Sequence, residues 1–490
     1  MTDQEFTNWL DSDGARRVVL AELGVNSGGS ETTRYIANQA FISAATDTPA
    51  GQFYEARLAD GLVLQETLGI AGGTASISHS DIQINNADGG LDSWLLDAWH
   101  NRVITVYLGD ASWPKADFRV VYAGVIDAVE GSGQDNLSVR VQDKMSRLDT
   151  AVTETKLGGG TPNADALIPL CFGECHNITP LLTNPATLEY AVHNGPIELI
   201  IEVRDNGVPV SFTSTPATGR FTLAAAPVGT ITASVQGDKP STYSNNVGAL
   251  IQRLVKDYGR SDVRFTSSDL DTANFSAFVT ANPQPVGLYL TDSTTVRDAC
   301  NRLADSVGAK MVMTRAGLLR LVKIVLPPAS TVAAISDSDI VIRSLQAELG
   351  LQIQAACKLG YCRNWTVQKD IQTGIPAQHK ELYSQEWLTV TSSDSTAATL
   401  HKLPIDVEQE DSLLLVTADA TTEAARRRAL RAAVRTVFSF TTGPKLMQVA
   451  LGDGLALTSD RYALSAGPSV LVTSLSIDWL GGTVRAEVLK

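Results

Sequence analysis

Five cysteines are the residues of this 490-residue chain whose chemistry most needs an explanation. Cys171 and Cys175 form C-x3-C in LCFGECHN, and Cys357 and Cys362 form C-x4-C in ACKLGYCRN. Four thiolates can hold zinc or an iron–sulfur cluster, so these two pairs are candidate metal ligands if they meet in space. Neither spacing matches the common C-x2-C form, however, and the pairs lie far apart in the sequence.

Two other interpretations of the same cysteine pairs compete with a metal site. Free cysteines are most often buried, where the thiol packs as a small apolar group. A disulfide within either pair would form only after the protein leaves the reducing cytoplasm. The fifth cysteine, Cys300, falls in an apolar helical stripe and is expected in a core. Apart from the metal candidates, the sequence indicates no cofactor.

The histidines and carboxylates show no catalytic arrangement. None of the six histidines stands in an HExxH motif or is matched by a glycine-flanked serine, and no phosphate-binding glycine loop is present. Acidic pairs such as Glu408 with Glu410 are expected to be surface carboxylates on loops. The sequence therefore predicts a protein that is not an enzyme.

Composition limits the classes of partner. The chain has 53 acidic and 39 basic residues, a formal net charge of -14, which argues against general nucleic-acid binding because phosphates attract basic patches. We find no apolar run of about 18 residues, and the N-terminus MTDQEFTNWLDSDG lacks the features of a signal peptide. We therefore expect synthesis in the cytoplasm and no membrane anchor.

The segment 288–324 organises the middle of the chain. Asp292 and Ser293 are candidate helix caps. The segment predicts a helix with one buried face, followed by Gly308 and by two apolar runs that flank the turn 314–317. The buried stripe consists of Val296, Ala299, Cys300, Leu303, Ala304 and Val307. We expect this stripe to pack on the hairpin behind it and on a second amphipathic helix that ends at Gly259.

Short apolar runs broken by Gly, Asp, Asn and Pro dominate the rest of the chain. They predict a mainly β protein with α+β parts and several domains. The loop 153–165, with three glycines, is the first predicted linker. The predicted domains are a β-domain at 1–152, a β-rich insert at 166–240, a small α/β domain at 241–328, and a second β-domain at 329–490.

One basic helix is predicted inside the last domain, at about 421–438. Thr421 or Thr422 would cap it. Its apolar side would consist of Leu430, Ala433, Val434, Val437 and Phe438, and its other side would carry Arg426, Arg427, Arg428, Arg431 and Arg435. No aromatic residues interleave these arginines, so a solvated or subunit-facing cationic surface is favoured over nucleic-acid recognition.

An ordered set of segments along almost the whole chain resembles the baseplate hub, or tail-tip hub, proteins of long-tailed bacteriophages. The set begins with YIANQAFISAATDTPAGQFYEARL, INNADGGLDSWL, NRVITVYLGD and VYAGVIDAV. It continues with FGECHNITPLL, YAVHNGPI, VRDNGVPV, GRFTL, GTITASVQG and the segment 288–324. It closes with LGYCRNWTVQ and LSAGPSVLVTSLSIDWLGGTVRAEVL. The cysteines in FGECHN and GYCRN depart from the family pattern, so the resemblance assigns them no role.

The resemblance implies a homotrimer at the distal end of the virion tail. Each chain would carry two tail-tube-like β-barrel or sandwich domains, at 1–152 and 329–490, so that three chains form a pseudo-hexameric ring that continues the tail tube. The implied partners are the distal tail protein ring, the tape measure protein, and tail fibre or central tip proteins. Genome DNA would pass through without specific binding, along a lumen that repels its phosphates.

Two alternatives remain at the level of sequence. A hexameric distal tail adaptor would also be a structural phage protein, but the chain's length and its two β-rich ends favour the hub. A tail-associated cell-wall hydrolase belongs to a different class and would need a catalytic cluster. The seven tryptophans are spread singly, which favours packing over carbohydrate binding.

Overall fold

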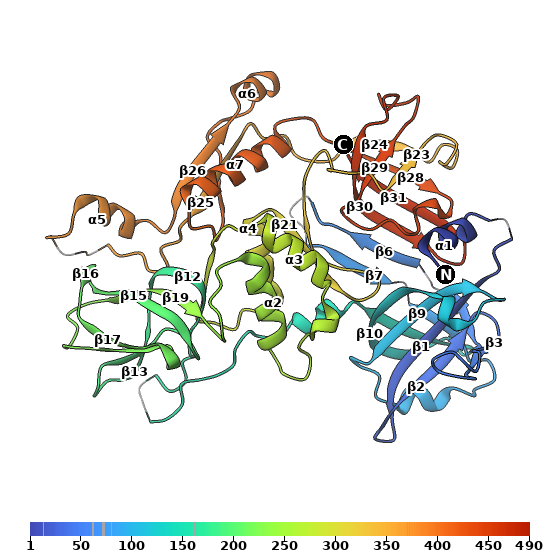
Figure 1. Ribbon diagram of the computed structural model, residues 1–490, viewed down its shortest axis with the longest axis horizontal. Coiled ribbons are helices and arrows are strands. Elements are labelled where there is room, and N and C mark those ends of the chain that lie inside the picture. Colours follow the sequence, from blue (N-terminus) through green and yellow to red (C-terminus); the bar gives the residue numbers. More distant parts are fainter. Residues whose placement is uncertain are drawn as a thin grey trace. The chain divides into compact units, whose positions relative to one another are not determined.

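The structure is a computed structural model that describes residues 1–12, 14–60, 63–70, 74–79, 81–160, 163–369, 371 and 373–490 (Figure 1). Strands make up 39% of it and helices 19%, which confirms a mainly β protein with α+β parts. Two residues of the predicted linker 153–165, at positions 161 and 162, lie outside the described residues. Among the described residues, none of the helices combines the length and the apolar composition that a membrane crossing would require.

The chain divides into two compact units, each built from separate stretches of sequence. Unit 1 comprises Met1–Ser146, Met311–Leu351 and Arg435–Lys490, and unit 2 comprises Arg147–Lys310 and Gln352–Val434. The predicted range 329–490 is therefore shared, because its central 83 residues pack with unit 2 and only its two ends pack with unit 1. The finer predicted boundaries at 152, 166 and 241 stay predictions.

Unit 1 begins with a capped helix and continues with two sets of strands. In α1 (Asp3–Leu10) the Thr2 hydroxyl accepts from the Glu5 backbone N–H while the Glu5 carboxylate accepts from the Thr2 backbone N–H. The first strand set is β1 (Arg17–Ser27), β2 (Ser30–Ala37), β3 (Phe41–Ile42), β4 (Phe53–Ala56), β5 (Leu58–Asp60), β6 (Val63–Thr67), β7 (Ser76–His79), β8 (Ile82–Asn85), β9 (Val103–Asp110), β10 (Arg119–Ser132) and β11 (Asn136–Gln142). The second set is β22 (Leu319–Lys323), β23 (Ala333–Ile335), β24 (Gln346–Leu349), β28 (Thr436–Thr442), β29 (Gly454–Leu457), β30 (Ser469–Asp478) and β31 (Thr483–Leu489).

Period-two alternation explains why these segments form sheets with a buried face. Along β11, for example, Leu137, Val139 and Val141 are buried while the residues between them are partly or fully exposed. Strands β1, β9, β10 and β11 pair antiparallel in that order. Apart from the β21–β22 hairpin, the strands of unit 1 join one hydrogen-bonded system that includes a closed barrel. The predicted C-terminal hairpin is confirmed as β30 and β31.

Unit 2 contains separate, smaller sheets and most of the helices. Its strands are β12 (Leu170–Ile178), β13 (Leu181–Asn184), β14 (Glu189–Ala191), β15 (Ile197–Asp205), β16 (Val208–Pro209), β17 (Phe212–Thr215), β18 (Arg220–Leu223), β19 (Ile231–Asp238), β20 (Gly287–Leu290), β25 (Ala356–Tyr361), β26 (Leu388–Ser393) and β27 (Gln409–Asp411). Its helices are α2 (Val247–Asp257), α3 (Thr272–Ala281), α4 (Val296–Ser306), α5 (Ala377–Ser384), α6 (Ser395–His401) and α7 (Thr417–Arg431). Strands β16, β15, β19, β12 and β20 form its largest sheet.

The two helices predicted from apolar stripes are both present. All six stripe residues of the segment 288–324 are at most 2% exposed, and α4 packs against α2 as expected. The cap of α4 is Thr295, whose hydroxyl accepts from the Asp298 N–H, three residues beyond the predicted cap Asp292. The hairpin strand β21 (Ala309–Met313) crosses the boundary between the units, so the hairpin from Met311 onward belongs to unit 1 and α4 to unit 2.

The prediction for the basic helix at 421–438 is wrong in its position and in its exposed face. Helix α7 runs from Thr417 to Arg431, Val434 is 57% exposed, and Val437 and Phe438 lie in β28. Its buried residues are Ala420, Glu423 and Ala424. The stripe that suggested a longer helix combined the end of a helix with the start of a strand.

The arginines of α7 do not form a solvated cationic surface either. Arg426 and Arg427 bind the buried carboxylate of Glu423, at 2.7 and 2.8 Å. Arg427 and Arg431 also bind Glu410, which sequence reasoning placed on an exposed loop, and Arg428 binds Asp394 at 2.9 Å. Glu423 is a local partner within α7, whereas Glu410 and Asp394 come from other segments, which the local sequence could not reveal.

Replacing Leu303 by Asn tests the packing of α4. Leu303 is 0% exposed, so the amide would be buried without partners and we expect the free energy of unfolding to fall by about 3 kcal/mol. Denaturant unfolding measures this change. The matched control Asn301→Gln, on the partly exposed side of α4, should change it by less than about 0.5 kcal/mol. Equal stability of both variants would contradict the packing of α4.

Candidate functional site

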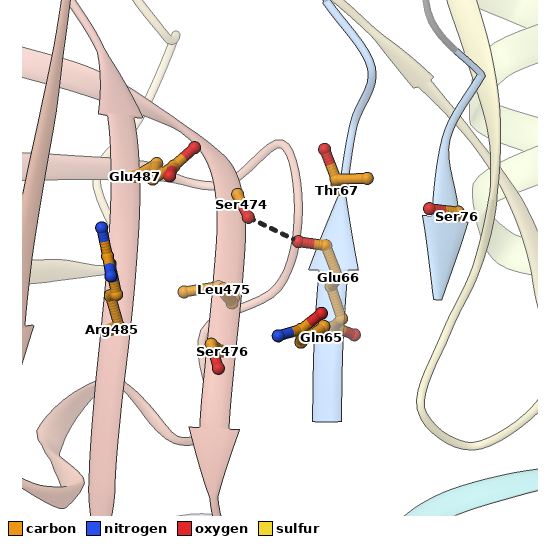
Figure 2. Close-up of a pocket in the computed structure, with 9 residues that line it drawn as sticks. All are labelled: Gln65, Glu66, Thr67, Ser76, Ser474, Leu475, Ser476, Arg485 and Glu487. Atoms are coloured by element: carbon orange, nitrogen blue, oxygen red, sulfur yellow. Dashed lines mark hydrogen bonds between the residues drawn. The ribbon is translucent and has the colours of Figure 1, made fainter. Parts of the chain in front are cut away.

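The two strand sets of unit 1 are joined edge to edge by one strand pair. Strand β6 pairs with β7 on one side and antiparallel with β30 on the other, with Leu64 opposite Ile477 and Thr67 opposite Ser474. The Ser474 hydroxyl also donates to the Glu66 carbonyl, 2.9 Å away, as Figure 2 shows. The two sets therefore share a continuous sheet, although residues 66 and 474 are 408 positions apart in the sequence.

One face of this joined sheet is polar. A shallow hollow of about 460 Å³ lies over it (Figure 2). Alternate residues of four strands supply its polar side chains: Gln65, Thr67, Ser76, Ser474, Ser476, Arg485 and Glu487. Leu64, Leu475 and Ile477 alternate with these residues and are buried, although Leu475 also borders the hollow. Its exposed groups are hydroxyls, an amide and one charge of each sign, and the buried, paired Glu66 also borders it.

A buried ion pair holds the junction from behind. Glu66 is 4% exposed, and its Oε2 lies 2.6 Å from an Nη of Arg315, which comes from the turn between β21 and β22. The same guanidinium donates to the carbonyls of Met447 and Val449, at 2.5 and 2.6 Å, and lies 5.7 Å from the Trp479 ring centre. Arg315 thus connects β6, the hairpin and the second strand set. Gly317 closes the turn at a φ of +72°, a conformation that favours glycine.

The cysteine pairs, which were the candidate metal ligands, lie in unit 2. Cys171 and Cys175 are fully buried in β12, and Cys357 is buried in β25, whereas Cys362 is partly exposed just after β25. All five cysteines are free, and Cys300 lies in a core as predicted.

Burial keeps several of these thiols protonated. It raises the pKa of Cys175, with a further contribution from a hydrogen bond with Cys171, and it raises the pKa of Cys357 to about 11. Within the described part of the chain, no three His, Cys, Asp or Glu side chains gather so as to hold a metal ion. The four cysteines are thus not assembled into one thiolate site.

A buried histidine beside the first cysteine pair was missed by sequence reasoning. His193 is 1% exposed, and its Nδ1 accepts from the backbone N–H of Cys171 at 3.1 Å, so Nε2 carries the proton. Nε2 lies 3.3 Å from Oδ1 of Asp238, close enough for attraction but not aligned as a hydrogen bond. The contact from Cys171 comes from its backbone and not from its thiol, and the group is closed to solvent, so the cluster is structural rather than a nucleophilic triad.

Asp238 is the centre of that cluster. Arg253 contacts both of its oxygens, at 2.7 and 3.2 Å, and the Tyr258 hydroxyl donates to Oδ1 at 3.0 Å. Burial alone would raise the pKa of Asp238, but the contacts with His193 and Arg253 outweigh burial and lower the pKa to about 2. The ionised carboxylate therefore ties β19 to α2.

Comparisons with known proteins give structural similarity only. No protein-family model matches the chain, and no curated protein matches it by sequence. A tail protein from Neisseria meningitidis is 12% identical, with 97% of each chain covered and a TM-score of 0.38. The 43 kDa tail protein of prophage MuSo2 from Shewanella oneidensis is 10% identical over 97% of this chain and 96% of its own, with a TM-score of 0.40. Prophage tail protein gp18 from Listeria monocytogenes is 8% identical over 96% and 94%, with a TM-score of 0.42.

A double-mutant cycle tests the junction. Arg315→Met would leave the Glu66 carboxylate buried without its partner, so we expect the free energy of unfolding to fall by about 3–5 kcal/mol. Glu66→Gln in the same background should restore part of that loss, as denaturant unfolding would show. The exposed pair Arg140 and Glu130 is the control, and its removal should cost at most about 1 kcal/mol. Equal effects of the two cycles would contradict the anchoring role of Arg315.

Acid unfolding tests the Asp238 cluster. A carboxyl whose pKa falls from about 4 in the unfolded chain to about 2 in the folded chain stabilises the fold above pH 4 and loses this effect as pH falls toward 2. Asp238→Asn should therefore be about 2 kcal/mol less stable than the parent at pH 6, with a difference that shrinks by pH 2–3. Asp262→Asn, at an exposed position, is the control. A difference independent of pH would contradict the ionised state of Asp238.

Proposed function

We propose that this chain is a structural hub of the tail tip or baseplate of a long-tailed bacteriophage, located at the distal end of the virion tail. Three copies would form a pseudo-hexameric ring that continues the tail tube. The observation that carries the proposal is the presence, in one compact unit, of two strand sets that share a five-strand pairing order and are joined edge to edge. The ordered sequence resemblance to hub proteins supports it independently.

The pairing of five strands repeats between the two sets. In the first, β6 pairs antiparallel with β7, and β9, β10 and β11 form a meander whose last strand pairs with β7. In the second, β24 pairs antiparallel with β28, and β29, β30 and β31 form a meander whose last strand pairs with β28. These five strands follow in the same chain order in both sets, while the first set has in addition β1–β5 and β8, and the second has β22 and β23.

This repeat suits a symmetric ring. Three copies of a chain with two similar strand sets present six similar surfaces, which would allow a trimer to dock onto the six-fold ring of a distal tail protein. A hexamer of this chain would present twelve such surfaces and would not match that ring. The repeat thus supports the hub over the hexameric adaptor.

The polar face of the joined sheet is the surface that we assign to the lumen. Its side chains are mostly neutral, and among the described residues that line the hollow shown in Figure 2 the cation is Arg485. Tight binding of DNA needs several Lys or Arg contacts to phosphates, so such a wall would let DNA pass without holding it. The acidity of the whole chain supports the same conclusion.

The remaining parts of the proposal concern partners and activity. We assign attachment of the tape measure protein and of fibre or central tip proteins to the hub as a whole. The role is structural and not catalytic. The solved structures described above are tail proteins, and the proposal itself rests on the strand repeat and on the sequence resemblance.

The number of copies tests the proposal. Native mass measurement of the purified full-length protein should give three copies, or about 157 kDa from the 52.2 kDa chain. Six copies would indicate the adaptor ring instead, and a single copy at every concentration would contradict the hub. A zymogram on host cell walls should show no lytic band for this protein. A lytic band that appears with the protein and disappears when the protein is left out would contradict the structural role.

A further inference from the structure

Strand β24 is an exposed edge of unit 1. All four of its residues are exposed, with Leu349 at 66%, and Ile342 just before the strand is 88% exposed. Among the described residues, β24 has a hydrogen-bonded strand partner on one side only, which is β28. An open strand edge next to exposed apolar side chains is a template for another strand.

The repeat within unit 1 indicates how that edge is covered. Strand β24 has the same place beside β28 and β31 that β6 has beside β7 and β11. The outer edge of β6 is covered by residues Ser474–Asp478 of β30, the middle strand of the other set's meander. The corresponding partner of β24 would be β10, which is the middle strand of the first set's meander.

Strand β10 has a matching open edge. On the side away from β11, β9 pairs with β10 only as far as Val125, and among the described residues no strand follows it there from Asp127 to Ser132. The Asp127 carbonyl lies 3.0 Å from Nδ1 of His100, which leaves the five residues 128–132 open, as many as the five of β30 that β6 covers. A side chain at Gly131 would meet no atom within 4 Å. Glu130 on this edge is paired with Arg140 at 2.7 Å. This pairing reduces the repulsion between Glu130 and Glu348 of an incoming β24.

We propose that β24 of one copy adds as an antiparallel strand to the 128–132 edge of β10 in a neighbouring copy. This inference rests on the proposed hub function and names the surface by which its copies join. Because β24 and β10 belong to the two different sets, the contact runs head to tail and closes into a ring when three chains are used. The ring then has six junctions of one kind, three within chains through β6 and β30, and three between chains through β24 and β10.

The occupant is a second copy rather than an unrelated strand for two reasons. The edge and its partner are both present in every copy, and their pairing continues a junction already formed inside the chain. Main-chain hydrogen bonds supply the contact, so the exposed side chains of β24 need no specific pockets. Covering Leu349 would also remove an apolar side chain from water.

Cross-linking between copies tests the inference. Two full-length chains of different tag length are co-expressed, one with Ala347→Cys in β24 and the other with Gly131→Cys in β10. The assembly is treated with a bismaleimide that spans the roughly 5–8 Å between side chains of adjacent strands. The control pair replaces Gly131→Cys by Ser30→Cys, at the exposed tip between β1 and β2. The parent chain, with its partly exposed Cys362, gives the background.

The mass of each sample is measured before the reagent is added. A trimer in which the Ala347→Cys and Gly131→Cys pair cross-links at least tenfold more than the Ser30→Cys control would support the inference. A trimer with no more cross-linking than the control would overturn the β24 and β10 contact and leave the hub function standing. Samples without a trimer would overturn the proposed function and the inference with it.

Discussion

The antiparallel pairing of β6 with β30 is the interaction on which unit 1 depends. It joins strands from opposite ends of the chain, and the buried Glu66 and Arg315 pair holds its back. Without it the two strand sets would be separate small sheets, each with an open edge. With it, they share one sheet that has an apolar face and a polar face, and the polar face becomes a surface that the chain can present to a central channel.

In unit 2, two buried carboxylates are held by arginines. Glu423 and Asp238 are both nearly inaccessible, and each is satisfied by arginines from a helix. Removing the arginine from such a cluster leaves the buried carboxylate without a partner, which is strongly destabilising. These clusters therefore specify the fold even where their net stabilisation is small. The thiols of Cys171 and Cys175 in β12 and of Cys357 in β25 are also buried.

Local patterns in the sequence predicted local structure well. The stripes of α2 and α4 and the hairpin of β30 and β31 were identified because periodicity and turn residues encode them directly. Helix α7 was misplaced because apolar residues of a following strand extended its pattern by chance. The joined sheet could not be predicted, since nothing near Val63–Thr67 indicates a partner more than 400 positions away, and a lone Arg315 in a turn gives no sign of its buried carboxylate. Asn194 and Gly195 after His193 likewise give no sign that the imidazole is enclosed.

The most direct test of the central claim is an electron cryomicroscopy image of assembled particles. We predict that three copies of this chain surround the tail axis at the distal end, and that six similar strand sets form one ring around the channel. Density for six copies in that ring, or for this chain away from the tail tip, would contradict it.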